Sequence, residues 1–192
     1  MIRLSISGLI DLPPLGHTGA VISIHDPGEG RPQELGGLNL SVLDLVFHDT
    51  EDDGDALDHL PERWHLEQVA RFLAGLPTQD PEFSLHVHCY AGVSRSTAVA
   101  SFVLASLTPK LTDAQIVRQV LAARPQAVPN QLLLKHADEL LGRKLHRAWG
   151  KQANRYSQRV STEKTPGKPS CRPGAYSYAI RPPILILSGG SI

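Results

Sequence analysis

The sequence predicts an α/β protein in which a central, mostly parallel sheet of about four to five strands is flanked by helices. Strand patterns dominate the first 90 residues, and helix patterns dominate residues 96–141. One helix pattern lies between two of the strands, which is the crossover connection that neighbouring parallel strands require. A chain of 192 residues is long enough to enclose the hydrophobic core of such a domain.

Four segments have strand patterns. Apolar and polar residues alternate in residues 2–6 and 84–88, as they do in a strand whose two faces have different surroundings. Residues 20–24 and 42–47 are short runs rich in aliphatic and β-branched residues, and Gly, Pro or acidic residues bound them. We therefore expect four strands before residue 90.

Four segments have helix patterns. Prolines bound the first, residues 61–76, in which apolar residues keep a helical spacing. Residues 96–107 are small or apolar on every side, which indicates a helix buried in the core. The third, residues 112–124, begins with the Thr-x-x-Gln spacing of a capping box, and the fourth covers residues 130–141.

The charges divide the chain into two regions. Seven of the 19 Lys and Arg residues lie from Lys151 onward, but only one of the 19 acidic residues does. This basic segment is rich in Ser, Gly and Pro and has no strand or helix pattern except the apolar run at 184–187. We predict a folded domain at residues 1–150 and a basic, largely disordered tail at residues 151–192, most simply a solvated appendage.

Composition also narrows the class of protein. No apolar stretch is long enough to span a bilayer, and the N-terminus lacks the long apolar region of a secretory signal. Two cysteines, Cys89 and Cys171, are too few for a disulfide framework, and we interpret Cys171 as incidental. We expect a cytoplasmic protein with no membrane span and no nucleic-acid partner.

The segment HVHCYAGVSRSTAVA, residues 86–100, joins a strand end to the buried helix through a short loop. Ligands of open α/β sheets bind beyond the carboxyl ends of the strands, where this loop lies. The helix N-terminus offers free N–H groups, Gly92 lets the loop turn its amides inward, and Arg95 can hold two phosphate oxygens. The same positive field favours the nucleophilic thiolate of Cys89. The loop therefore predicts a phosphate site next to an activated cysteine.

The stretch HCYAGVSRST resembles the signature loop of the protein tyrosine phosphatase superfamily, and its His-Cys-x-x-Gly-x-Ser-Arg-Ser pattern is similar to the dual-specificity branch in particular. FHDT, residues 47–50, resembles the segment that supplies the general acid in that branch. RPQAVPN, residues 124–130, resembles its downstream Arg-Pro…Pro-Asn segment. The resemblance covers roughly residues 1–145 and is closest to compact bacterial members.

The resemblance implies a role for each matching residue. Cys89 would be the nucleophile, and Arg95 would bind the phosphoryl oxygens. Ser96 would hydrogen-bond the sulfur and help it leave, and Asp49 would act first as general acid and then as general base. His88 would brace the loop and help hold the thiolate. The other substrate-binding residues of the loop would be Tyr90, Ala91, Gly92, Val93 and Ser94. The resemblance implies no metal and no cofactor.

The general acid has alternatives within the same acidic segment. Asp49 comes first after the strand and occupies the position that the resemblance indicates. Its separation from Cys89 is longer than the resemblance leads us to expect, so Asp52 or Asp53 could supply the proton instead. A solvated acidic loop also needs no catalytic role.

Two further polar residues have competing interpretations. His86 and His88 could suggest a metal site, but the chain lacks a convincing third and fourth ligand, so we expect His86 in or near the core. Asn130 either caps the helix that it begins or ties that helix to the loop.

We predict a cysteine-dependent phosphatase that hydrolyses phosphate monoesters through a cysteinyl-phosphate intermediate. Residues 90–94 contain no Lys or His and the domain is acidic, which favours a phosphorylated protein over a polyanion. Phosphotyrosine, phosphoserine and phosphothreonine all stay open. The alternatives are a phosphate-binding pseudophosphatase, a phosphatase of small or other non-protein phosphoesters, and an enzyme that uses the loop for arsenate or sulfur transfer. An arsenate reductase would need resolving cysteines close by.

Overall fold

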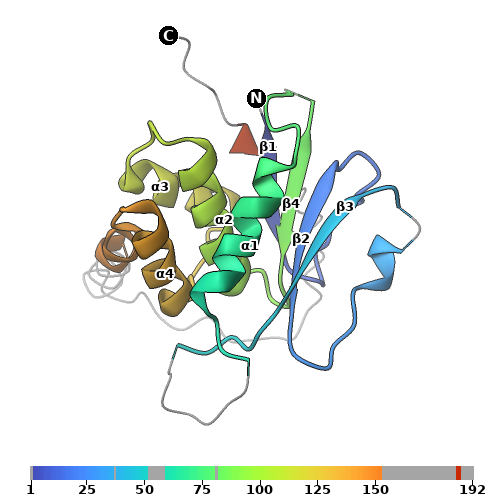
Figure 1. The fold of residues 1–192 in the computed structure, drawn as a ribbon, viewed down its shortest axis with the longest axis horizontal. Helices are drawn as coiled ribbons and strands as arrows, with labels where there is room; N and C mark the ends of the chain where they lie inside the picture. The colour runs from blue at the N-terminus through green and yellow to red at the C-terminus, as the bar shows by residue number, and fades with distance from the viewer. Residues whose placement is uncertain (1, 37, 52–58, 81, 153–184, 187–192) are drawn as a thin grey trace, which may run out of the picture.

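A five-stranded sheet with the strand order β3-β2-β4-β1-β5 forms the centre of the computed structural model (Figure 1). The structure describes residues 2–36, 38–51, 59–80, 82–152 and 185–186. The strands are β1 (Arg3–Ser7), β2 (Ala20–His25), β3 (Ser41–Val46), β4 (Ser84–His88) and β5 (Leu185–Ile186). The first four pair in parallel, and β5 pairs antiparallel with β1. The predicted mostly parallel sheet is therefore confirmed, with β5 inside the apolar run of the tail.

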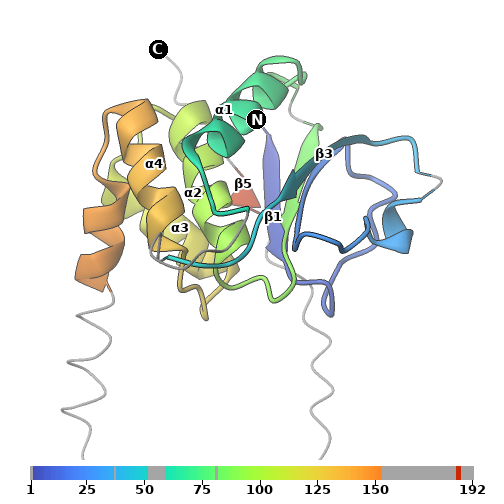
Figure 2. The same cartoon turned by 60° about the horizontal axis from the view of Figure 1, so that its bottom comes forward.

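The helices α1–α4 lie on one face of the sheet (Figures 1 and 2). Their bounds are α1 (Arg63–Ala74), α2 (Arg95–Leu107), α3 (Asp113–Ala123) and α4 (Gln131–Leu141), and a 3-10 helix, η1 (Gln33–Leu35), lies on the other face. The capping box predicted for the third helix is present, because the Thr112 and Gln115 side chains each bond the backbone of the other residue. A further helical segment begins at residue 145 and continues to residue 152.

The main core lies between the sheet and the helices. It contains alternate residues of the strands, such as Leu4, Ile22 and Val87, together with most of α2. Because nearly all residues of α2 after Arg95 are small or apolar, it fits the centre of this layer, with α1, α3 and α4 packed against it. A smaller cluster of Leu15 and Leu35 covers Val21 on the other face.

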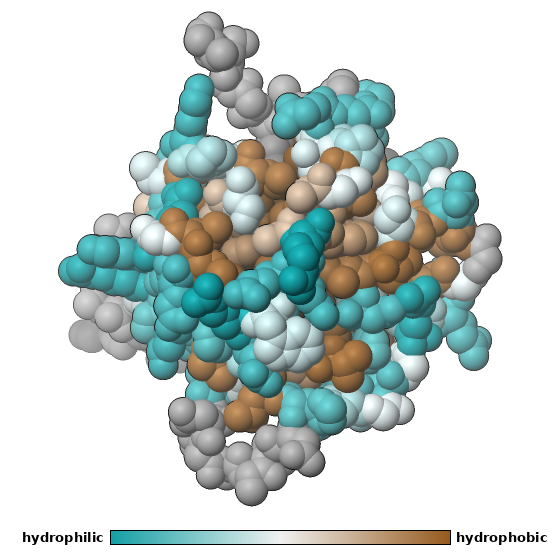
Figure 3. Space-filling model, in the orientation of Figure 1, coloured by the Kyte–Doolittle hydropathy of each residue, from teal (hydrophilic) through white to brown (hydrophobic). Residues whose placement is uncertain are grey.

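The surface follows the amphipathic pattern of the outer helices. Polar residues cover most of the face over α4, whereas apolar side chains gather around α1 and β3 (Figure 3). Within the described ranges, no helix is long and apolar enough to cross a membrane.

The predicted boundary near residue 150 falls inside the helical segment that reaches residue 152. Most of the predicted tail lies outside the described residues, including Cys171. The candidate acids Asp52 and Asp53 also lie outside them. The division of the chain into a domain and a tail therefore stays a prediction.

Candidate active site

The carboxyl ends of β1–β4 lie along one edge of the sheet, where residues 89–94 connect β4 to α2 (Figure 2). We call residues 89–94 the signature loop. Segments that follow the other strands contact this loop or the residue after it: Leu9 follows β1, Asp26 follows β2 and Asp49 follows β3. Parallel strands all end at one edge, which explains how residues far apart in the sequence meet here.

Cys89 is the first residue of the signature loop, and its side chain is buried. Its Sγ lies 3.2 Å from the Oγ of Ser96, in the first turn of α2, and accepts a hydrogen bond from the Gly92 amide at 3.2 Å. The sulfur thus lies near a helix N-terminus, where N–H groups favour negative charge. The structure places the predicted nucleophile and Ser96 in contact.

Groups outside the signature loop bind four consecutive carbonyl oxygens in it. The Leu9 amide donates to Tyr90 O at 2.9 Å, and the Val128 amide donates to Val93 O at 3.0 Å. Between them, Arg124 donates to the carbonyls of residues 91 and 92 at 3.4 and 3.0 Å. All four carbonyls therefore point out of the loop.

The amides of the same peptide groups point the other way. In a planar trans peptide the N–H is antiparallel to the preceding C=O, so outward carbonyls at residues 90–93 turn the amides of residues 91–94 inward. The Gly92 amide shows this direction, because it donates to Cys89 Sγ. Within the described part of the chain, no hydrogen bond from the amides of Ala91, Val93 or Ser94 is found. The amides of residues 91–94 thus face the inner side of the loop, where Cys89 Sγ accepts from one of them, and such a concavity suits an anion.

The sharp curvature of the loop depends on Gly92. Its φ is +68°, in the left-handed region that glycine adopts readily. A Cβ at this position would also lie 2.3 Å from Gly8 N and 2.5 Å from Arg124 Nη2. Gly92 is therefore needed both for the backbone angle and for the close approach of β1.

Arg124 connects three parts of the site. Its guanidinium is almost completely buried, binds the two loop carbonyls and pairs with Asp11, which in turn accepts from the Gly8 amide at 2.7 Å. These contacts tie the signature loop to the end of β1. Arg124 belongs to the RPQAVPN segment that the sequence singled out, but its role in holding the carbonyls follows only from the structure.

Arg95 is buried at the start of α2, and its side chain is 4% exposed. Nη1 and Nη2 bind the two carboxylate oxygens of Asp26 at 3.0 and 3.1 Å, and Nη1 also donates to the Phe47 carbonyl at 2.7 Å. Among the described residues, Arg95 Nε is buried without a hydrogen-bond partner. The guanidinium is thus anchored at its far end, while its Nε–H stays available.

Asp49 lies beside the signature loop, as the sequence predicts for the general acid. Its Oδ1 accepts from Ser94 Oγ at 2.7 Å and from Asn130 Nδ2 at 3.0 Å, while Oδ2 lies 3.8 Å from Arg95 Nε. Asn130 caps α4, because its Oδ1 accepts from the Leu133 amide at 3.0 Å. Asn130 thus makes both kinds of contact: it caps α4, and it connects α4 to the segment that carries Asp49.

The two histidines of β4 face away from the main core. His86 is fully buried, with its ring nitrogens 2.7 Å from Ser5 Oγ and 3.0 Å from Ser7 Oγ, and burial lowers its pKa to about 3. Burial lowers the pKa of His88 to about 4, and repulsion from His25 makes a smaller contribution in the same direction. Both rings are therefore neutral at pH 7, and His86 is buried beside the main core, on the opposite face of β4 from Leu85 and Val87, in line with the expectation of a position in or near the core.

His88 is the last residue of β4 and directly precedes Cys89. No hydrogen bond to either of its ring nitrogens is found among the described residues, and none joins the ring to Cys89 Sγ. The described residues also contain no cluster of three or more His, Cys, Asp or Glu side chains that could hold a metal ion. The predicted bracing role of His88 stays a prediction.

Solved structures similar to this chain include dual-specificity and tyrosine phosphatases. The chain is similar to DUSP15 at 24% identity, with a TM-score of 0.54, over 78% of this chain and 91% of that chain. It is similar to Tk-PTP in the active form at 20% identity, with a TM-score of 0.53, over 74% of this chain and 92% of that chain.

A third similar structure is the human tyrosine phosphatase-like serine/threonine/tyrosine-interacting protein, at 19% identity with a TM-score of 0.53 over 70% of this chain and 84% of that chain. No protein-family model matches the chain, and no curated protein matches it in sequence. The structural likeness establishes that the chain has the dual-specificity phosphatase-like fold, which confirms the fold predicted from the sequence.

Proposed function

We propose that this protein is a cysteine-dependent phosphatase that hydrolyses phosphate monoesters in two steps. The observation that carries the proposal is the inward direction of the amides of residues 91–94 around Cys89 Sγ. A tetrahedral oxyanion on the sulfur would accept hydrogen bonds from these amides and from Arg95 Nε. This geometry serves a phosphoryl group better than it serves a buried structural thiol.

In the first step the Cys89 thiolate attacks phosphorus, and an S–P bond forms as the bond from phosphorus to the leaving oxygen breaks. Asp49, held at Oδ1 by two donors, gives a proton to the leaving oxygen. The inward amides and Arg95 stabilise the charge on the three phosphoryl oxygens. The products are a cysteinyl phosphate and an alcohol or phenol.

In the second step water attacks the cysteinyl phosphate. The Asp49 carboxylate takes a proton from the water, a P–O bond forms, and the S–P bond breaks to release inorganic phosphate. The Ser96 hydroxyl, 3.2 Å from Sγ, donates a hydrogen bond to the departing sulfur and stabilises its negative charge. Neither step requires a metal ion.

For the substrate we propose a phosphorylated protein. Three of the exposed large apolar side chains, Ile10, Tyr90 and Val128, belong to the signature loop or to segments whose backbones bond to it. The groups proposed to bind the oxyanion, the amides of residues 91–94 and the buried Arg95, include no exposed cation. A polyanion would therefore gain little binding energy beyond that of a single phosphate group. Apolar surface around a single phosphate site suits the flanking residues of a phosphopeptide.

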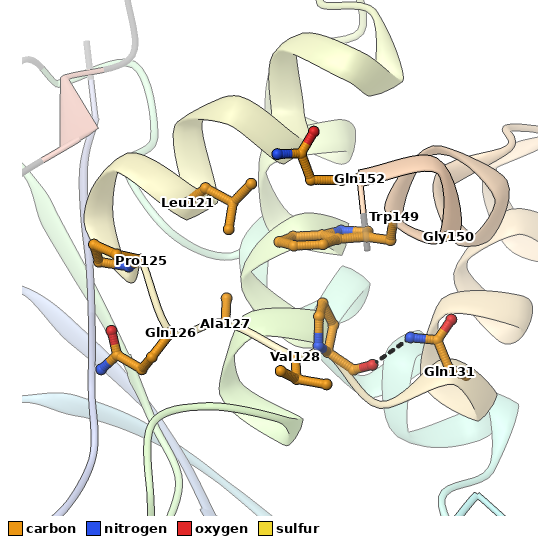
Figure 4. A pocket seen from close by; sticks show the side chains of 10 residues that line it. Leu121, Pro125, Gln126, Ala127, Val128, Gln131, Trp149, Gly150 and Gln152 are labelled. Atoms are coloured by element: carbon orange, nitrogen blue, oxygen red, sulfur yellow. Dashed lines mark hydrogen bonds between the residues drawn. The ribbon is translucent and has the colours of Figure 1, made fainter. Parts of the chain in front are cut away.

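An apolar pocket of about 500 Å³ extends this surface. Trp149 and Leu121 line one side of it and Val128 the other, and Gln131 donates to the Pro129 carbonyl at its rim (Figure 4). Trp149 is fixed by a hydrogen bond from Nε1 to Ser101 Oγ at 3.2 Å. One side of the pocket is therefore held in place by this hydrogen bond of Trp149, and the pocket adjoins the signature loop through Val128.

Hydrolysis of p-nitrophenyl phosphate by the wild-type protein and by Cys89→Ser tests the proposal. Cys89→Ser should lose all turnover yet still bind a phosphotyrosine peptide, since the amides and Arg95 are unchanged. EDTA should leave the wild-type rate unchanged. Substantial turnover by Cys89→Ser would show that the nucleophile is another residue.

The same pair of proteins separates the phosphatase from its main alternative. A wild-type protein that binds the phosphopeptide without hydrolysing it would be a phosphate-binding pseudophosphatase. Tyrosine, serine and threonine phosphopeptides compared at equal concentration would define the preferred residue. A cytoplasmic location stays a prediction from the composition.

A further inference from the structure

Asp26 makes the most direct side-chain contact with the arginine of the site. It follows β2 directly, and both of its carboxylate oxygens accept from Arg95, at 3.0 and 3.1 Å. The carboxylate is also 3.4 Å from His48 Nδ1, on the segment that leads to Asp49. Asp26 has no task of its own in the proposed first step, and its two shortest side-chain contacts are with Arg95.

The hydrogens of the guanidinium show what this contact does. Arginine has five N–H donors in one plane: one on Nε and two on each Nη. Asp26 takes one hydrogen from each Nη, and the Phe47 carbonyl takes the second hydrogen of Nη1. The Nε hydrogen and the second hydrogen of Nη2 remain, and these two lie side by side.

Such a pair of parallel N–H groups is the fork with which arginine binds two oxygens of a phosphate. Arg95 Nε is buried and makes no hydrogen bond among the described residues. The Asp49 carboxylate is its ion-pair partner, but Oδ2 lies 3.8 Å from Nε, too far for a hydrogen bond, so the Nε–H can still donate to a phosphate oxygen. Asp26 holds the Nη1–Nη2 edge of the guanidinium, and the fork is the neighbouring Nε–Nη2 edge. Asp26 and a phosphate would therefore bind Arg95 at the same time instead of competing for it.

We propose that Asp26 is a positioning residue that fixes the Arg95 guanidinium with its Nε–Nη2 fork toward the signature loop. This inference rests on the proposed function, because it assigns a task within that site. An anchored fork loses less conformational freedom when an oxyanion binds, and it keeps the orientation that the transition state needs.

Asp26→Asn is the sharpest variant, since it keeps the shape of the side chain but turns one acceptor into a donor and removes the charge. Tungstate, an oxyanion of phosphate shape, is the probe, with binding measured by calorimetry. We expect Asp26→Asn to weaken tungstate binding about 10- to 100-fold, the range for losing a hydrogen bond between charged groups. Hydrolysis of p-nitrophenyl phosphate should show both a higher KM and a lower kcat, and Asp26→Glu should recover part of both.

Asp44→Asn is the matched control. Asp44 also pairs with an arginine, Arg31, and lies near a histidine, and its side chain is 31% exposed, the same as Asp26. It lies within β3 and makes no contact with Arg95 among the described interactions. Tungstate affinity and kcat/KM should be unchanged in Asp44→Asn, and thermal unfolding should show that both variants are folded.

The double variant Asp26→Asn/Arg95→Ala separates positioning from a general structural role. If Asp26 acts through Arg95, the double variant binds tungstate as weakly as Arg95→Ala alone. Tighter tungstate binding by Asp26→Asn would overturn the proposal, because it would mean that the carboxylate competes with the oxyanion. The proposal would also be overturned if Asp26→Asn lowered tungstate affinity by the same factor in the wild-type background and in the Arg95→Ala background.

The binding measurement does not depend on turnover. If the wild-type protein binds tungstate but hydrolyses nothing, the proposed phosphatase activity is refuted. The tungstate affinities of the Asp26 and Arg95 variants then still decide whether Asp26 positions Arg95. A wild-type protein that binds no tungstate refutes both.

Discussion

Replacement of Gly92 by alanine tests the physical basis of the signature loop, because the new Cβ meets two separate penalties. The first is the backbone angle: an L-residue in the left-handed region, at φ +68°, costs about 1–2 kcal/mol. The second is steric, since the Cβ would lie 2.3 Å from Gly8 N and 2.5 Å from Ser7 C. Ordinary contacts of this kind are about 3.5 Å or longer, so backbone atoms must move by roughly 1 Å.

Gly142 provides the matched control. It has nearly the same backbone angle, φ +62°, at the C-terminus of α4, and nothing lies within 4 Å of where its Cβ would be. Gly142→Ala therefore carries the first penalty alone, about 1–2 kcal/mol. Gly92→Ala adds an overpacking cost of about 1–3 kcal/mol, for a total of about 2–5 kcal/mol.

Urea unfolding of the two variants measures this difference, and tungstate binding measures its effect on the site. We expect Gly92→Ala to be destabilised more than Gly142→Ala and to lose most of its tungstate affinity, because the inward amides turn when the loop moves away from β1. Gly142→Ala should bind as the wild type does. Equal loss of stability in both variants, with tungstate binding retained by Gly92→Ala, would refute the argument that close packing against β1 sets the amide directions.

Two further predictions concern the acid and the buried histidines. Asp49→Asn should slow hydrolysis of phosphotyrosine about 10²- to 10⁴-fold, but it should slow hydrolysis of an activated aryl phosphate much less, because a good leaving group needs no proton. If Asp52→Asn showed this dependence on the leaving group and Asp49→Asn did not, the proton donor would be Asp52. In the unfolded state His86 and His88 gain a proton below about pH 6.5, whereas in the folded state they do so only near pH 3 and pH 4. The free energy of unfolding should therefore decrease as the pH is lowered from about 6.5 toward 4, by up to about 1.4 kcal/mol per pH unit for each histidine. Urea unfolding at pH 7.5 and pH 5 checks this, and an unchanged slope in His86→Gln would show that the pH dependence has another source.

Local patterns determined most of the secondary structure. Strand alternation, proline boundaries and the capping box of α3 depend on neighbouring residues, so β1–β4 and α1–α4 were predictable from residues close in the sequence. The signature loop was predictable for the same reason, because Cys89, Gly92 and Arg95 lie within seven consecutive positions. The order of the strands was not, since it depends on pairing between distant segments.

The tertiary structure alone decided which side chains hold the loop and its arginine. Asp26 is 69 positions from Arg95, and Asp11 is 113 positions from Arg124. No local pattern marks these residues, because each looks like an ordinary polar residue in a turn. They become site residues only when parallel pairing brings the ends of four strands to one edge of the sheet. The sequence by itself thus determined which residues lie together in the signature loop, and the packing of distant strand ends decided the directions of the donors around Cys89.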